Sequence, residues 1–135
     1  MKLTKELKEL ISKWKKILKL EDWDLDIQLE CPKKYKEIEK AVGFEPGVSR
    51  GMNTSTEERQ HSLIILNAES GDTLEEYLVH ELIHSIVNEI DEFNDNVISH
   101  ILNKEAASIL KTRELEVLEK LVWKYTRIVL ELDKK

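Results

Sequence analysis

Residues 73–93 read TLEEYLVHELIHSIVNEIDEF, and this stretch decides how the rest of the chain must be arranged. Asp72 or Thr73 can cap the amino end of a helix here. The acidic residue three positions later, Glu75 or Glu76, would complete a capping box. Apolar side chains then recur at helical spacing around so much of the circumference that we predict a largely buried helix, ending at about Phe93. These side chains are Val79, Leu82, Ile83, Ile86, Val87, Ile90 and Phe93.

The region before this helix predicts strands and turns. Residues 23–29 alternate apolar and polar side chains, the period-two pattern of a strand with one buried face. Residues 48–54 and 61–67 flank the polar stretch 55–60, and the later segment is rich in β-branched residues, so we predict an antiparallel hairpin. All the glycines and prolines lie between residues 32 and 71, which places the turns in this part of the chain.

Both ends of the chain predict helices. Apolar residues recur every three or four positions from residue 3 to residue 19, which indicates an amphipathic helix. A short helical stretch is expected around residues 35–40. The run Asn94-Asp95-Asn96 is expected to end the buried helix and to cap the next one, predicted for residues 97–111, and a last helix is predicted for residues 114–132.

The predicted architecture is one small α+β domain that spans residues 1–135. A short, mostly antiparallel sheet of about three strands would pack against an amino-terminal helix, the buried helix and the two helices that follow. The chain has one domain's length, and 41% hydrophobic residues exclude a disordered chain. The longest apolar runs have only four or five residues, far fewer than the roughly 20 of a membrane-spanning helix.

Charge and cysteine content limit the expected partners and compartment. A formal net charge of -6 argues against nucleic acid as the main partner. The lysines of the first 20 residues are interpreted as the solvated face of a helix. The single cysteine, Cys31, cannot form an internal disulfide, and the amino terminus lacks the apolar core of a secretory signal. We therefore expect a cytoplasmic protein that binds neither nucleic acid nor a membrane, with Cys31 in a structural role; the oligomeric state is not predicted.

The buried helix carries the pattern His80-Glu81-Leu82-Ile83-His84. Residues four apart on an α-helix are turned by about 40° and lifted by about 6 Å, so both imidazoles project from one face and can bind one zinc ion. Glu81 is turned by about 100° from His80, which places its carboxylate beside the ion. There it can accept a proton from metal-bound water and later deliver it to a leaving amine. The pattern predicts His80 and His84 as zinc ligands and Glu81 as the catalytic residue.

A catalytic zinc ion needs a third protein ligand. Asp91 lies about 10 Å further along the same helix, out of reach of the ion. The helix predicted for residues 97–111 offers Glu105 and His100, which point about 140° apart. Glu105 falls within an otherwise apolar stripe, where a charge is costly unless it is paired or bound to a metal. Glu105 is therefore favoured over His100, and an unidentified residue or a water molecule stays open as a third possibility.

Together these residues resemble the gluzincin group of zinc metallopeptidases, in which the histidines of this short motif and a glutamate on a later helix bind the ion. The segments VHELIH (residues 79–84) and KEAAS (residues 104–108) look like that arrangement. The similarity covers about residues 60–110 at the level of motifs. The small size, the strand with Trp23, the hairpin before the motif helix and the trailing helices are similar to minigluzincins and related small phage-type metallopeptidases. The resemblance implies a zincin-like fold and zinc bound by the motif histidines and Glu105.

The resemblance also implies details around the ion. In this family an Asp often follows the glutamate ligand by four residues and orients the first histidine; Ile109 stands there in this chain, so Ser108 or a backbone carbonyl would have to orient His80. The substrate usually pairs with an exposed strand edge above the site, for which residues 62–66 are the candidate. Candidate donors to the oxyanion are His61, Tyr77, His100 and Tyr125.

The function predicted from the sequence is that of a zinc-dependent metallopeptidase. A peptide or protein would be the substrate and Zn²⁺ the cofactor, and relatives of this kind can be latent, held inactive by a terminal segment. The alternative is a module that binds zinc without catalysis, and a third hypothesis is a metal-free helical interaction domain. Zinc content separates the third hypothesis from the others, and cleavage of peptides separates the first from the second.

Overall fold

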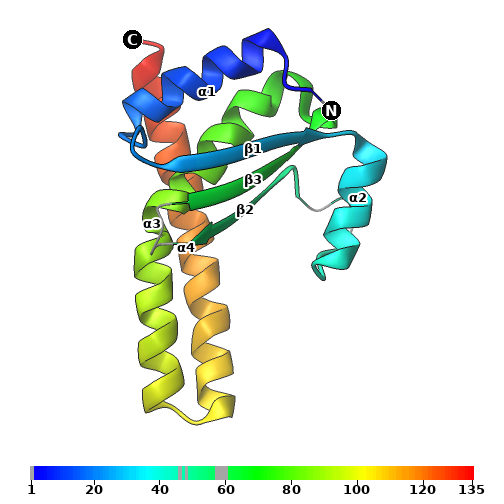
Figure 1. The fold of residues 1–135 in the computed structure, drawn as a ribbon. Helices are drawn as coiled ribbons and strands as arrows, with labels where there is room; N and C mark the ends of the chain where they lie inside the picture. The colour runs from blue at the N-terminus through cyan, green and yellow to red at the C-terminus, as the bar shows by residue number, and fades with distance from the viewer. Residues whose placement is uncertain (1, 46, 48, 57–60) are drawn as a thin grey trace.

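The computed structural model describes residues 2–45, 47, 49–56 and 61–135, and within them the chain forms a small α+β domain (Figure 1). This confirms the predicted fold class. In chain order the elements are α1 (Lys5–Ile17), β1 (Asp24–Glu30), α2 (Pro32–Ala41), β2 (Gly51–Thr56), β3 (His61–Asn67), a 3-10 segment (Ala68–Thr73), α3 (Leu74–Ile101) and α4 (Lys104–Asp133).

The strands form one sheet in the order β1-β3-β2. β3 runs antiparallel to β2, with Gly51 opposite Leu66, which confirms the predicted hairpin. Val48, where the first strand was expected to begin, and the connection at residues 57–60 lie outside the described residues. β1 runs parallel to β3, so the sheet is mixed and not mostly antiparallel as expected. The chain between β1 and β3 is long enough for the crossover that a parallel pair requires.

The core lies where α1 and α3 meet the sheet. Trp14 of α1 is fully buried, and its indole nitrogen donates a hydrogen bond to Glu75 of α3 at 2.8 Å. Alternating residues of β1 and β3 point into the same core, which is the reason for the period-two pattern of residues 23–29. The buried apolar residues that pack together include Leu7, Ile27, Leu29, Ile64, Leu66, Leu78, Val79, Leu82 and Val122.

The last two helices differ from the prediction. α3 continues through Asn94-Asp95-Asn96 to Ile101, and α4 continues through residues 111–114, so the chain has two long helices where three shorter ones were expected. The turn between them lies at Leu102 and Asn103. Asn103 caps α4, because its side-chain oxygen accepts a hydrogen bond from the Ala106 amide at 2.9 Å.

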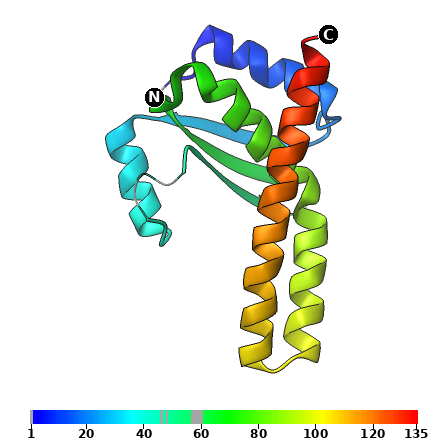
Figure 2. The same cartoon turned by 180° about the vertical axis from the view of Figure 1, so that it is seen from behind.

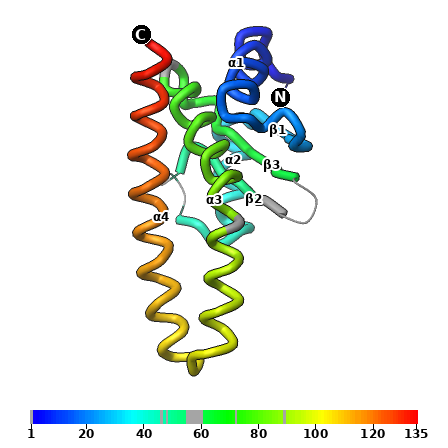
Figure 3. Tube along the Cα trace, turned by 90° about the vertical axis from the view of Figure 1, so that its left-hand side faces the viewer, coloured from blue at the N-terminus to red at the C-terminus, as the bar shows by residue number. Residues whose placement is uncertain are grey.

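An ionic cluster explains why the acidic run does not end α3. Lys111 of α4 contacts both Asp91 and Asp95 of α3 at 2.6 Å. These contacts use the aspartate side chains, which would otherwise compete for the backbone and favour a helix end. The two helices therefore run side by side and antiparallel, and their lower halves project beyond the sheet (Figure 3). Within the described part of the chain, no helix combines the length and the apolar character needed to cross a bilayer.

Candidate metal centre

Three side chains from α3 and α4 converge on one point. The Nε2 atoms of His80 and His84 are 3.2 Å apart. Glu119 of α4 reaches both of them, with Oε1 2.9 Å from His80 Nε2 and Oε2 2.9 Å from His84 Nε2. The structure thus brings together the two histidines that the motif predicts and adds a carboxylate from the neighbouring helix.

The arrangement fits a divalent zinc ion. Two imidazole nitrogens and a carboxylate oxygen are a ligand set found in catalytic zinc sites, and donors held at about 2.0–2.1 Å with tetrahedral angles lie about 3.3 Å apart. The separations of 2.9–3.2 Å are close to that value. These three side chains could therefore hold one metal ion.

Glu105, the expected third ligand, does not lie with the histidines. It is exposed in the first turn of α4, 14 positions before Glu119, and therefore about 21 Å away along the helix axis. His100, the other candidate, lies at the far end of α3, where its Nδ1 is 2.6 Å from the Asn96 carbonyl oxygen. The prediction of Glu105 was wrong about position because the turn between the helices lies later in the chain than expected.

The first histidine packs against an aromatic ring. His80 is 3% exposed, and its ring centroid is 4.0 Å from that of Trp123. Trp123 follows Glu119 by four residues, the position at which the gluzincin resemblance places an aspartate. Ser108, expected to orient His80, is exposed and one turn from the distal end of α4. Among the described residues, the buried Nδ1 of His80 has no hydrogen-bond partner.

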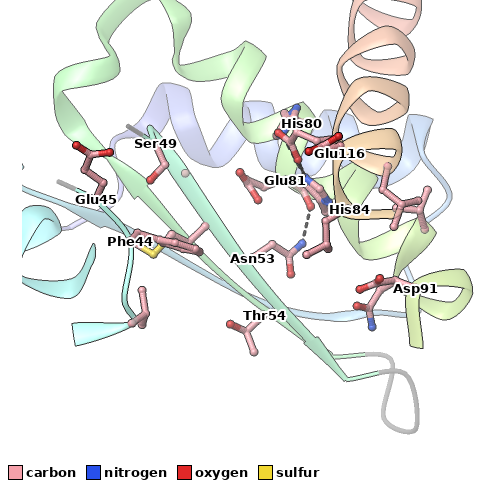
Figure 4. A pocket seen from close by; sticks show the side chains of 18 residues that line it. Phe44, Glu45, Ser49, Asn53, Thr54, His80, Glu81, His84, Asp91 and Glu116 are labelled. Carbon is pink, nitrogen blue, oxygen red and sulfur yellow. Dashed lines mark hydrogen bonds and ion pairs between the residues drawn. The ribbon is translucent and has the colours of Figure 1, made fainter. Parts of the chain in front are cut away.

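Glu81 occupies the place that the motif predicts. Its side chain is 6% exposed and faces the space between α3 and β2 (Figure 4). The strand can approach this closely because residue 51 is glycine: a Cβ there would lie 2.9 Å from Glu81 Cγ. From the same strand, Asn53 donates hydrogen bonds to the Glu81 carbonyl oxygen and, at 2.7 Å, to Ser85 Oγ. β2 therefore fixes the turn of α3 that carries Glu81.

The charges of the cluster shift one another's pKa values. Burial raises the pKa of Glu81 to about 7, although the nearby His84 and His80 favour its ionised form. Hydrogen bonds from the two histidines hold the pKa of Glu119 well below its ordinary range. Burial opposes protonation of His84, but the Glu119 carboxylate outweighs it and raises the pKa of His84. The cluster thus combines a firmly ionised carboxylate with a buried carboxyl that can change its protonation state near neutrality.

A pocket of about 750 Å³ opens beside this cluster. Residues of β2, α3, α4 and the segment after α2 line it, among them Phe44 and Thr54 (Figure 4). The strand at the pocket is β2, the edge of the sheet, and not residues 62–66, which belong to the central strand β3. The expectation that residues 62–66 form an exposed edge was wrong, because β1 and β2 pair with both sides of β3.

None of the four expected oxyanion donors lines this pocket. His61 contacts Asp24 at 3.2 Å on the sheet, and Tyr77 packs edge-on against Trp123. His100 lies at the end of the projecting helices, and Tyr125 is exposed on α4.

Glu119 and Trp123 are the two residues of the site that sequence reasoning missed. Glu119 is flanked by Leu118 and Val122 on the apolar stripe of α4, which is the same signal that had favoured Glu105. The sequence therefore contains two glutamates with this pattern, and the position of the turn between α3 and α4 decides which of them lies beside the histidines.

No protein-family model, curated protein or solved structure matches this chain. The resemblance of its motif to the gluzincins stays a prediction, and its function has to be inferred from the chemistry and geometry of the site.

Proposed function

We propose that this protein is a zinc-dependent peptidase in which His80, His84 and Glu119 hold the ion. The observation that carries the proposal is the convergence of three side chains: the two imidazole nitrogens lie 3.2 Å apart, and each is 2.9 Å from one of the two oxygens of Glu119, spacings close to those of tetrahedral zinc. The position of Glu81 beside this cluster supports catalysis, because the general base of such an enzyme must lie next to the ion without binding it.

The residues around the ion would each have a defined part in peptide hydrolysis. Zinc, when bound, supplies a Lewis acid that polarises a carbonyl group and lowers the pKa of a bound water toward about 7. Glu81 accepts the proton from the attacking water and delivers it to the nitrogen of the leaving amine. Its burial keeps bulk water from competing for that proton, and Asn53 holds the backbone of Glu81 in place.

The substrate would bind as an extended peptide along β2. Gly51, Met52, Asn53 and Thr54 of this edge strand all line the pocket. An edge strand offers backbone groups that pair with an added strand, and the pocket beside it accepts a side chain of that strand. The opposite wall, formed by α3 and α4, contains the three proposed zinc ligands, so a peptide on β2 would pass next to the ion.

A second candidate is a zinc-binding module without catalytic activity. It is favoured by one observation: the residues expected to stabilise an oxyanion lie elsewhere, and none of the four lines the pocket. Such stabilisation commonly contributes 10²–10³-fold to the rate of acyl transfer. In this case the same three ligands would hold zinc, and Glu81 would be a buried carboxyl group without a catalytic role.

Metal content measured alongside cleavage of a mixed peptide pool tests the proposal. We expect one zinc per chain and cleavage products in the pool. Glu81→Gln is expected to abolish cleavage and to keep the zinc. Glu116→Gln is the matched control, since Glu116 also lines the pocket but pairs with Arg113 at 3.0 Å; this variant should keep both properties. Zinc without cleavage in the wild type would favour the module, and absence of zinc would refute both.

A further inference from the structure

The outer side of the α3–α4 pair carries a large exposed apolar surface, which includes the projecting half. On α3, large apolar residues that are substantially exposed recur at steps of four and three positions. These are Ile86, Ile90, Phe93, Val97 and Ile101.

α4 carries a second row of the same kind, with steps of seven, four and three positions. Its members are Leu110, Val117, Leu121, Tyr125 and Ile128. Spacings of this kind keep side chains on one face of a helix.

Both rows lie on the same side of the helix pair. α3 faces α4 through His84 and Asp91, which contact Glu119 and Lys111. In each helix the exposed row is turned by about 130° from these contacts, in the same rotational sense. Because the helices run antiparallel, an equal rotation in the same sense brings both rows to one side. We call this surface the back face.

The back face points away from the sheet and from the pocket. Ser85 of α3 contacts Ser62 of β3 at 2.7 Å, and it is turned in the rotational sense opposite to that of the exposed row. Figure 2 shows α4 from this rear side, with the strands behind it, and nothing in the described chain covers the lower halves of the two helices.

The area of the back face is that of a protein interface. Its ten residues leave on average about half of their surface exposed, and at roughly 150–200 Å² for each whole residue this amounts to roughly 800 Å². A stable dimer buries about 800 Å² on each partner. Monomers rarely expose a continuous apolar patch larger than a few hundred Å².

We propose that the back face pairs with the back face of a second copy of this chain. Two antiparallel helix pairs would then form a four-helix bundle, the arrangement in which rows at steps of three and four residues interlock. A membrane surface is a poorer occupant, since the chain carries a net charge of -6 and anionic headgroups would repel it. The two pockets of the dimer would face outward, away from the bundle.

Measurement of the molar mass in solution, over concentrations up to about 100 µM, tests this pairing. We expect twice the 15.8 kDa of one chain for the wild type. Phe93→Glu places a charge in the centre of the back face and should give a monomer with unchanged circular dichroism. Ile109→Glu is the matched control: Ile109 is 66% exposed, as Phe93 is 67% exposed, but it lies on the opposite side of the helix pair. This variant should stay dimeric.

The outcomes are separable from those of the zinc experiment. If Phe93→Glu fails to fold, Phe93→Ser removes apolar surface without adding charge and should weaken the dimer at least tenfold. A wild-type monomer at every concentration would overturn the proposal, as would a dimer that only Ile109→Glu dissociates. Flotation of a monomeric wild type with phosphatidylserine vesicles would assign the face to a membrane instead. Zinc content should be the same in Phe93→Glu as in the wild type.

Discussion

The two halves of α3 have similar apolar content but different surroundings. From Leu78 to Ser85 every residue except His84 is buried, whereas from Ile86 to Ile101 no described side chain is buried. The embedded half is enclosed by the sheet, α1 and α4, and it carries His80, Glu81 and His84 of the candidate metal centre. The projecting half packs against α4, and only its first residues, such as Val87, also reach the core. A periodic apolar pattern therefore predicts that one face of a helix will be covered. It does not predict which element, of this chain or of another, covers that face.

Core stability should show the largest difference between the embedded and the projecting half. Leu82 is fully buried in the embedded half of α3, and Ile109 is exposed on the part of α4 beside the projecting half. Leu82→Ala should lower the free energy of unfolding by about 2–5 kcal/mol, because it leaves a cavity among packed side chains. Ile109→Ala should change it by less than about 0.5 kcal/mol. Urea denaturation followed by circular dichroism measures both, and equal losses would show that the projecting half is packed in solution.

Zinc affinity should distinguish two glutamates of α4, Glu119 beside the embedded half of α3 and Glu105 beside the projecting half. Glu119→Ala removes one of the converging donors and should weaken zinc binding by at least about 100-fold, more than the loss of a supporting hydrogen bond. Glu105→Ala, in the first turn of α4, should leave the affinity unchanged. Competition with a chromophoric chelator gives both constants. A loss with Glu105→Ala alone would place the third ligand where the sequence first suggested it.

A smaller effect is expected where β2 presses on the embedded half. Gly51→Ala would place a methyl group 2.9 Å from Glu81 Cγ, so either the strand or the carboxyl must move. A displacement of this size next to a reacting group should lower kcat/KM by about 10-fold to 100-fold, with zinc content preserved. Thr54→Ala, on the exposed end of the pocket strand, is the control and should change kcat/KM little. An unchanged rate for Gly51→Ala would mean that the position of Glu81 is not critical.

The smallest effect is expected at Glu39 of α2, and it concerns the free energy of unfolding. Burial would raise the pKa of Glu39, but hydrogen bonds from the Gly47 amide and from Ser49, each at 2.9 Å, outweigh it and lower the pKa. The ionised form therefore stabilises the fold at neutral pH, and this stabilisation is lost as the pH falls through the lowered pKa. Glu39→Gln should cost about 1 kcal/mol at pH 7 and less at about pH 3. The same cost at both pH values would contradict this account.

The error about the third ligand can be traced to one turn. If the chain reversed near Asp95, as the acidic run suggested, the residue opposite His84 on the returning helix would be near position 106, beside Glu105. The reversal at Leu102 and Asn103 instead brings a residue near position 121 opposite His84, beside Glu119. When the turn moves by seven or eight residues along the chain, the position opposite His84 on the returning helix changes by twice that number. Asn and Asp signal a helix end only weakly, and the contacts of Lys111 with Asp91 and Asp95 override that signal here.

By itself, the sequence determined the local structure: the strands near residues 23–29 and 61–67, the amphipathic first helix, and a buried helix with two histidines and a glutamate on defined faces. These features depend on side-chain periods of two and 3.6 residues, which are properties of neighbouring residues in the chain. Only the tertiary structure decided which glutamate meets the histidines, that β2 is the edge beside the pocket, and that the projecting helices leave an apolar face uncovered. Each of these depends on contacts between residues far apart in the sequence, and no local pattern specifies them.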